Sequence, residues 1–314
     1  MNEFELINKY FSPSGSSRKD IFLGIGDDCA LLVPPSGQLL AVTTDTLVCG
    51  VHFAEQTHPY DIGYKSLAVN LSDLAAMAAE PAWFSLALTL PQVDEMWLEA
   101  FCQGFAALQS PFKLGLVGGD TTRGHLSISI TAQGFVPADK CLTRAGAKVG
   151  DKIWVTGTLG DAGAGLKILQ GKLNTAPEYE NFLLSRLHRP TPRVGEGLSL
   201  RNLAHAAIDI SDGLAADLTH VLKSSGVGAT IFVDHLPIST ALGQTVPLSQ
   251  AWQLALSAGD DYELCFTLPA AKQAKLNFGC TCIGEITAEP GLRLQLSSGE
   301  TYDGLSRLGY QHFG

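Results

Sequence analysis

The sequence has little positive charge. Its 314 residues include 21 Lys and Arg against 31 Asp and Glu, a formal net charge of −10. Proteins that bind nucleic acid present a basic face to phosphate, so this balance argues against a nucleic-acid partner. Charged residues make up only 17% of the chain and hydrophobic residues 46%, which excludes a disordered protein. The length suggests two domains.

Long hydrophobic runs are also missing. The apolar stretch Trp83–Leu90 is far shorter than the roughly 18–20 residues of a membrane helix, so we expect no membrane span. Met1–Tyr10 contains Glu3 and Glu5 and no basic segment followed by an apolar one, which predicts that no signal peptide is present. The sequence therefore predicts a cytoplasmic protein that does not associate with membranes.

The cysteines and histidines form no metal-binding pattern. Seven cysteines are spread from Cys29 to Cys282 without a CxxC pair, and the eight histidines show no HxxxH spacing. An odd, scattered set of cysteines is typical of reduced thiols, not of a disulfide framework or a zinc site. Any metal ion is therefore expected to have oxygen ligands.

Strand and helix patterns mix irregularly along the chain. Apolar periodicity predicts strands at 38–48, 83–90, 114–117, 127–136, 153–155, 206–210, 231–233 and 264–268. It predicts helices at 59–79, 94–109, 161–170, 192–203 and 214–223. A polar, basic, glycine-containing stretch at 137–150 interrupts the pattern. We therefore predict an α/β (α+β) protein of two domains, residues 1–137 and 138–314.

Aspartate outnumbers glutamate, with 18 Asp and 13 Glu, although glutamate is the better helix former. Most of the distinctive Asp residues lie beside glycine or at a predicted strand end, where the backbone can approach a ligand closely. They occur in seven short motifs: GDD at 26–28, TTDT at 43–46, LSD at 71–73, GGD at 118–120, GD at 160–161, DISDG at 209–213 and GDDYE at 259–263.

Turn and helix-cap chemistry is the alternative explanation for any single one of these motifs. It does not explain Asp73, in the middle of a predicted amphipathic helix, or Asp45, where the apolar run of a strand stops. Two unit charges about 4 Å apart repel by about 4 kcal/mol at an effective dielectric of about 20, so converging carboxylates need cations. Mg²⁺ prefers such ligands and is shared with substrate phosphates, which suggests a multi-metal phosphate site as a hypothesis.

No familiar phosphate-binding loop supports this hypothesis. The sequence lacks both GxxxxGK[ST] and GxGxxG. The segment GDAGAGLK at 160–167 follows a predicted strand and opens a helix, but its lysine is misplaced for a P-loop. We interpret its glycines as helix-start and packing positions, with nucleotide binding as the alternative.

The order of the motifs resembles that of the thiamine-monophosphate kinase family, in the superfamily of aminoimidazole ribonucleotide synthetase and selenophosphate synthetase. The resemblance covers nearly the whole chain, and its specificity lies in the order and spacing of motifs that are uninformative singly. The motifs are GIGDDCALL (24–32), TTDTLVCGVHF (43–53), KSLAVNLSDLAAMAAEPAW (65–83), GGDTTRG (118–124), LTRAGAKVGDKIWVTGTLGD (142–161), DISDGL (209–214) and GDDYELCF (259–266).

The resemblance implies ATP-dependent phosphorylation of thiamine monophosphate to thiamine diphosphate. It also implies two α/β domains, a homodimer built through a mixed sheet of the N-terminal domains, and ATP with several Mg²⁺ ions between the domains. By motif, it assigns metal binding to Asp28, Thr44, Asp45, Asp73, Asp120, Asp209 and Asp212. It assigns ATP contacts to Gly119, Asp120, Arg144 and Ser211, and substrate contacts to His52, Asp260, Asp261, Glu263 and Phe313.

Several assignments depend on the resemblance alone. Without it, Arg144 would be a solvated linker residue, His52 a satisfied core histidine and Phe313 part of a frayed C-terminus. The chemistry permits the implied roles, since a guanidinium clamps phosphate with fixed donors and an aromatic ring can stack on a flat thiazolium. Asp260 stands where the family commonly has Glu, so the charge is kept with a shorter reach.

The implied reaction is direct in-line transfer of the γ-phosphoryl group. The acceptor phosphate is already anionic, so no acid or base residue is expected, and positioning and charge cancellation supply the catalysis. One alternative is another ATP-using member of the superfamily, although the reactive N-terminal or C-terminal cysteine of the selenophosphate and hydrogenase-maturation enzymes has no counterpart here. The other alternative is a non-catalytic protein that binds divalent cations without nucleotide.

Overall fold

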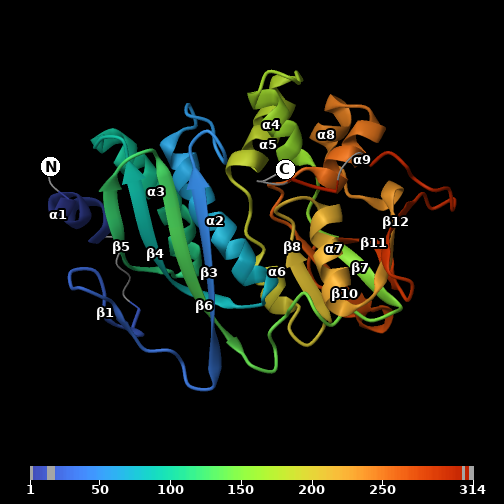
Figure 1. Cartoon of the computed structure of the whole chain (residues 1–314), viewed down its shortest axis with the longest axis horizontal. Coiled ribbons are helices and arrows are strands. Elements are labelled where there is room, and N and C mark those ends of the chain that lie inside the picture. The colour runs from blue at the N-terminus through green and yellow to red at the C-terminus, as the bar shows by residue number, and fades with distance from the viewer. Residues whose placement is uncertain (1–2, 13–17, 306–307, 311–314) are drawn as a thin grey trace. The chain divides into compact units, whose positions relative to one another are not determined.

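The computed structural model describes residues 3–12, 18–305 and 308–310 (Figure 1). The chain forms two compact units. The first unit consists of Met1–Leu74 and Ala79–Asp139, and the second of Ala75–Ala78 and Lys140–Gly314. Within the described ranges, no helix is both long enough and apolar enough to cross a membrane.

The first unit is built on a four-stranded sheet with the strand order β3-β6-β4-β5. β4 and β5 are parallel, and the other neighbours are antiparallel. The strands are β3 (Gln38–Val48), β4 (Glu80–Leu90), β5 (Gly115–Arg123) and β6 (Ser127–Pro137). Four short elements precede them: α1 (Glu3–Leu6), η1 (Ile7–Phe11), and the antiparallel pair β1 (Ile21–Leu23) and β2 (Leu31–Leu32).

Two helices, α2 (Pro59–Ala76) and α3 (Glu95–Phe112), lie on one face of this sheet (Figure 1). They cross in close contact, because a Cβ atom at Gly104 would lie 2.0 Å from the carbonyl oxygen of Tyr60. Glycine at this position therefore lets the two helix backbones touch. The N-terminus of α3 is capped by Asp94, whose side chain accepts hydrogen bonds from the backbone of residues 96 and 97.

Helix α2 is more deeply buried than its predicted amphipathic pattern suggests. Every residue from 65 to 72 is buried, including the polar Lys65, Asn70 and Ser72. The amide of Asn70 donates to the carbonyl of Ser66, one turn earlier in the same helix. The helix backbone thus accepts a hydrogen bond from the Asn70 amide nitrogen, whereas the Asn70 Oδ1 atom is buried without a hydrogen-bond partner among the described residues.

The second unit contains a six-stranded sheet with the order β12-β9-β11-β7-β10-β8. Only β12 and β9 are parallel. The strands are β7 (Asp151–Thr156), β8 (Ala206–Asp209), β9 (Gly228–Phe232), β10 (Leu264–Pro269), β11 (Cys280–Thr287) and β12 (Gly291–Gln295). The helices are α4 (Asp161–Leu169), α5 (Pro177–His188), α6 (Val194–Ser199), α7 (Leu214–Ser225), α8 (Thr240–Thr245) and α9 (Leu248–Ser257), with the short η3 (Val233–His235) and η4 (Ala270–Lys275).

The mixed α/β class is confirmed, and every predicted strand and helix overlaps an observed one. The elements that the pattern did not predict include β1, β2, α5, α8, α9 and β12. β1 and β2, of three and two residues, are too short to show an apolar period. β5 was predicted to stop at 117 but continues to Arg123. It continues because Gly118 and Gly119 keep their pairing with β4, so Asp120 lies within a strand and not at its end.

Close packing of α2 and α3 predicts a stability cost for Gly104→Ala. The added methyl group meets the Tyr60 carbonyl and forces the helices apart, and we expect a loss of about 1–3 kcal/mol in the free energy of unfolding. Urea unfolding measures this loss. Gly118→Ala is the control, because a Cβ atom there meets no atom within 4 Å. Equal losses for both variants would contradict the packing explanation.

Candidate functional site

Two carboxylates lie together in the first unit. Asp45 is in β3 and Asp73 is near the end of α2, and the Thr43 hydroxyl donates a hydrogen bond to the Asp73 carboxylate. Burial, and secondly the charge of Asp73, raise the pKa of Asp45 to about 6. Two partly buried carboxylates that repel each other form an oxygen donor set that suits a divalent cation such as Mg²⁺.

Thr44 and Asp120 lie on the opposite face of the sheet from Asp45. Side chains alternate along a strand, and the pairing register places Thr46, Ser129, Ala87 and Asp120 in one row across β3, β6, β4 and β5. Thr44 and Asp120 are exposed on this face. The first unit by itself therefore does not bring Asp120 to the Asp45–Asp73 pair.

Gly119 occupies a position that only glycine fits. It pairs with Leu86 of β4, and a Cβ atom on Gly119 would lie 1.8 Å from the Leu86 carbonyl oxygen. The absence of a side chain keeps β5 paired with β4 where the strand turns polar. The GGD motif thus combines a close strand contact with an exposed carboxylate, that of Asp120.

Asp28 and His52 lie in loops of the first unit. Asp28 is exposed in the segment between β1 and β2. His52 follows β3, and its Nδ1 atom accepts a hydrogen bond from the backbone N–H of Val48 at 3.0 Å. This bond assigns the proton of the neutral imidazole to Nε2, so His52 can act as a hydrogen-bond donor there.

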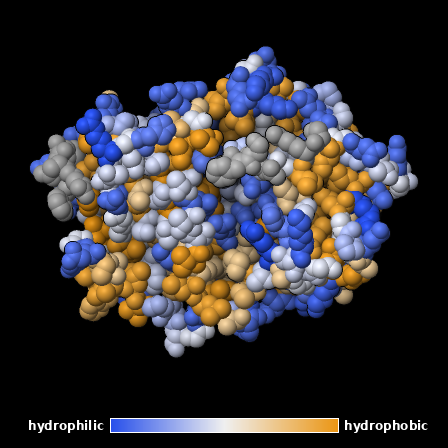
Figure 2. Space-filling model, viewed as in Figure 1, coloured by the Kyte–Doolittle hydropathy of each residue, from blue (hydrophilic) through white to orange (hydrophobic). Residues whose placement is uncertain are grey.

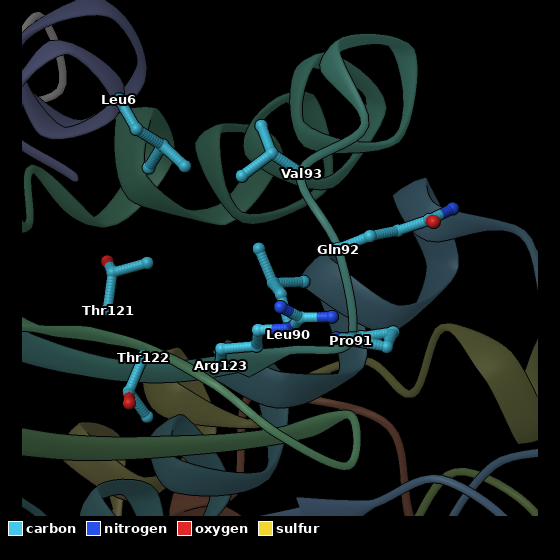
Figure 3. Close-up of a pocket in the computed structure, with 8 residues that line it drawn as sticks. All are labelled: Leu6, Leu90, Pro91, Gln92, Val93, Thr121, Thr122 and Arg123. Atoms are coloured by element: carbon cyan, nitrogen blue, oxygen red, sulfur yellow. The ribbon is translucent and has the colours of Figure 1, made fainter. Parts of the chain in front are cut away.

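A pocket of about 560 Å³ opens at the end of β5 (Figure 3). It directly follows the GGD motif, and Arg123 is its positively charged member. The pocket is lined by Leu6, Leu90, Pro91, Gln92, Val93, Thr121, Thr122 and Arg123. The sequence reasoning did not single out Arg123, although the cationic residue of GGDTTRG was a signal for a phosphate contact.

In the second unit, the DISDG loop is held by an aspartate that the sequence reasoning missed. Asp217, in the first turn of α7, accepts hydrogen bonds from the backbone N–H groups of Ser211, Asp212 and Gly213 at 3.1, 3.0 and 3.1 Å. Burial raises the pKa of Asp217 to about 7 against the effect of these donors. An acidic residue one turn into the helix after DISDG was the available signal.

The DISDG and GDDYE motifs lie side by side. The N–H of Asp260 donates to the Ser211 carbonyl, and the N–H of Tyr262 to the Ile210 carbonyl, both at 2.8 Å. Asp260 and Tyr262 have left-handed backbones, with φ of 71° and 50°. Such conformations are uncommon for residues other than glycine and cluster at functional sites. The structure therefore brings Asp260 close to the Asp209–Asp212 segment.

The four residues of this turn alternate in exposure. Asp260 and Tyr262 are half-buried, whereas Asp261 is 1% exposed and Glu263 is 0% exposed. One Asp261 oxygen accepts from the backbone N–H of Gly160 at 2.7 Å, and the other has no hydrogen-bond partner among the described residues. Burial raises the pKa of Asp261 well above its ordinary value.

Glu263 is fully engaged by protein donors. Its carboxylate accepts from the Thr156 hydroxyl at 2.6 Å, from Nη2 of Arg186 at 2.8 Å, and from Nε and Nη2 of Arg193 at 2.6 and 2.7 Å. Both arginines are contributed by helical segments, Arg186 by α5 and Arg193 just before α6. Asp260 is thus the acidic residue of this turn whose side chain can reach a ligand.

The remaining assigned residues lie in loops or outside the description. Arg144 is exposed, and its backbone is tied to α7 through Ser225, whose hydroxyl donates to the Arg144 carbonyl at 3.2 Å. Phe313 lies outside the described residues. Tyr310 is close to it in sequence, and its N–H donates to the Asp212 carbonyl at 3.0 Å.

No three His, Cys, Asp or Glu side chains in the described part of the chain gather closely enough to hold a metal ion. The assigned ligands are instead divided, with the Asp45–Asp73 pair in the first unit and Asp209 and Asp212 in the second. A cation held by two carboxylates takes its remaining oxygen ligands from water and substrate phosphates.

Comparison with known proteins shows the family to which the chain belongs. Residues 26–136 match the family described as AIR synthase related protein, N-terminal domain, and residues 148–297 match its C-terminal domain. The thiamine-monophosphate kinase of Escherichia coli K12 is 51% identical over 319 residues, covering 99% of this chain and 98% of that protein. The chain belongs to the thiamine-monophosphate kinase family.

Solved structures agree with this membership. Thiamine-monophosphate kinase from Stenotrophomonas maltophilia is 50% identical, with a TM-score of 0.85, and the match covers 91% of this chain and 93% of that one. A structure of AaThiL complexed with AMPPCP and TMP is 32% identical, with a TM-score of 0.79 and coverage of 99% and 97%.

The burial of Asp261 predicts a pH-dependent difference between the wild type and Asp261→Asn. Because the pKa of Asp261 is raised in the folded state, the folded protein binds this proton more tightly than the unfolded chain does. The free energy of unfolding therefore falls as pH rises above about 4, the ordinary pKa of Asp. The amide keeps an acceptor for Gly160 and does not ionise. Denaturant unfolding from about pH 5 to about pH 8 should therefore shift the stability difference in favour of the variant. A shift in favour of the wild type would show that the ionised carboxylate is the stabilised form.

Proposed function

We propose that this protein phosphorylates thiamine monophosphate to thiamine diphosphate at the expense of ATP. The observation that carries the proposal is the near full-length match to thiamine-monophosphate kinases, 51% identical over 99% of the chain. The repelling pair of Asp45 and Asp73 supports it, because a site that receives Mg²⁺-bound phosphates needs such carboxylates. A relative solved with AMPPCP and TMP supports the same pair of substrates.

Several Mg²⁺ ions are the proposed cofactors, and the aspartate-rich donor set fits them. When bound, Mg²⁺ neutralises phosphate charge and thereby stabilises the transition state of phosphoryl transfer. The side chains proposed to hold the ions are Asp28, Thr44, Asp45, Asp73, Asp120, Asp209 and Asp212. No acid or base residue is needed, because the acceptor phosphate is already anionic.

The chain's own contribution is to bind and align two anionic substrates. Gly119, Asp120, Arg144 and Ser211 are proposed to contact ATP, and the pocket beside β5 adds Arg123 as a further donor for its phosphates. Holding donor and acceptor phosphates in line supplies most of the rate enhancement in such transfers. The products are ADP and thiamine diphosphate.

Thiamine monophosphate is proposed to contact His52, Asp260 and Phe313. The Nε2–H of His52 is a donor for an acceptor atom of the substrate. The carboxylate of Asp260 suits the thiazolium cation. Asp261 and Glu263 are buried and are proposed to contribute by holding the turn that carries Asp260.

The first unit is proposed to form a homodimer through the sheet face opposite α2 and α3. This face carries exposed apolar side chains, with Leu40 47% and Val42 58% exposed. Figure 2 shows hydrophobic side chains over the lower ends of β3 and β6 and a weakly polar area over their middles. A second copy on this face would cover the apolar patch and enclose Thr44 and Asp120.

The cytoplasm is the proposed location. All seven cysteines are free thiols in the structure, as is typical of reducing compartments. ATP, the proposed co-substrate, is consistent with this location.

A direct assay tests the function. Purified protein with ATP and Mg²⁺ is offered thiamine monophosphate and free thiamine separately, and the products are identified by mass spectrometry. We expect thiamine diphosphate from the monophosphate. If no diphosphate forms, the proposal is wrong, and cation binding in the absence of nucleotide, measured by calorimetry, would favour a cation-binding protein instead.

Asp45→Asn and Asp73→Asn test the metal assignment. Each removes a carboxylate from the pair, and we expect kcat to fall by about 10²–10³-fold and the Mg²⁺ concentration for half-maximal rate to rise. Asp94→Asn is the matched control, because Asn also caps the N-terminus of α3. Near-normal turnover of either site variant at limiting Mg²⁺ would contradict the assignment.

Val42→Glu tests the dimer. A charge buried on the proposed interface without a partner disfavours association, so we expect the variant to sediment as a single chain. Met96→Glu, at a position 80% exposed on α3, should keep the wild-type mass. Unchanged sedimentation of the Val42 variant would exclude this face as the interface.

A further inference from the structure

A buried ion cluster in the second unit lies behind the turn that carries Asp260. Glu263 is fully buried, and four short hydrogen bonds from Thr156, Arg186 and Arg193 reach its two oxygens. The Arg193 side chain is 21% exposed and Arg186 is 12% exposed, so water screens these contacts little. None of the assigned metal or ATP contacts uses the two arginines.

The turn needs such an anchor because of its backbone. Asp260 and Tyr262 both have a left-handed backbone conformation. Residues other than glycine adopt this conformation only where the surrounding structure holds them in it. Asp261 and Glu263 are buried on either side of Tyr262, and Asp260 directly precedes Asp261, so fixing these two carboxyl groups constrains the main chain at both left-handed residues. Asp261 is fixed by the Gly160 N–H, and Glu263 by the guanidinium pair.

The segment that follows β7 is shaped to receive this cluster. Gly157 has a φ of 55°, and a Cβ atom on it would lie 2.2 Å from an Oε atom of Glu263 and 2.7 Å from Nη2 of Arg193. The glycine therefore leaves the space that the ion pair fills. Thr156 bonds Glu263 with its hydroxyl hydrogen and accepts from the Leu264 N–H at 2.9 Å. The VTGTLGD motif thus forms one wall of the anchor.

The cluster is better suited to fixing positions than to adding stability. Its ion pairs join two buried acidic side chains, those of Asp161 and Glu263, to two guanidinium groups. Burying charges costs desolvation energy that apolar packing avoids, so ion pairs of this kind are poor sources of stability. An arginine fork does, however, set both the place and the orientation of a carboxylate.

We propose that Arg186 and Arg193 are positioning residues for the acceptor substrate. They fix Glu263, and Glu263 holds the strained turn that presents the Asp260 carboxylate to thiamine monophosphate. The inference rests on the proposed function. It places the specificity of acceptor binding partly in two residues that do not touch the substrate.

Arg193→Lys is the central test variant. Lysine keeps the charge but cannot make the two parallel bonds from Nε and Nη2, so Glu263 is held less precisely. We expect KM for thiamine monophosphate to rise about tenfold, with KM for ATP unchanged within about twofold, as for a displaced contact residue. Arg193→Met should raise KM for thiamine monophosphate further, so lysine gives partial rescue.

Glu285→Gln is the control for the loss of an ion pair elsewhere in the second unit. Glu285 pairs with Lys152 at 2.7 Å, and both side chains are more than a third exposed, so its loss breaks an ion pair in the same unit away from the turn. We expect Glu285→Gln to keep both KM values. Thermal unfolding of all variants identifies any that fail to fold, and Arg193→Lys, the mildest change, then decides the question.

The outcomes separate the two claims. If the wild type phosphorylates thiamine monophosphate but Arg193→Lys leaves its KM unchanged, the positioning inference is wrong and the function stands. If the variants lose kcat in proportion to their folded fraction, with both KM values unchanged, the cluster is only structural and the inference is also wrong. If the wild type makes no thiamine diphosphate, the proposed function fails first.

Discussion

The proposed site depends on the repulsion between two carboxylates, those of Asp45 and Asp73. Asp45 and Asp73 lie where water is partly excluded, and the pKa of Asp45 rises to about 6 as a result. The Thr43 hydroxyl donates a hydrogen bond to the Asp73 carboxylate. A cation shared with substrate phosphates relieves the repulsion between the two carboxylates. The proposed metal chemistry therefore follows from the burial of this pair and from the repulsion between its members.

The second unit treats its acidic residues in two ways. Asp217 and Glu263 are both buried. Asp217 accepts hydrogen bonds from backbone N–H groups, and Glu263 accepts them from a hydroxyl and two arginines. They thereby hold the loops that carry Asp212 and Asp260, which remain accessible. Buried carboxylates that hold the loops therefore lie in or close to the same motifs as the carboxylates proposed to bind ligands. Their different roles come from their partners, not from their residue type.

The sequence predicted the α/β class and the centres of the regular elements, because apolar periodicity reports burial directly. It was less informative where a segment is buried on all sides, as in α2, or where glycine keeps a polar strand paired, as in β5. The motif order identified the family and the substrates. The motif GDDYE could not reveal which of its acids faces inward, because that depends on Arg186 and Arg193, far from it in the chain.

The sequence by itself determined which residues are available for chemistry: an excess of aspartate, glycine beside it, and no cysteine or histidine pattern for metal. Only the tertiary structure decided which acidic side chains are bonded to other parts of the protein and which can reach a ligand. Asp45 and Asp73 meet because a helix packs on a strand, and Asp260 is turned outward because a buried ion cluster holds its neighbours. The reason is physical: a carboxylate's role is set by the donors and charges within a few ångströms, and folding supplies these from distant parts of the chain.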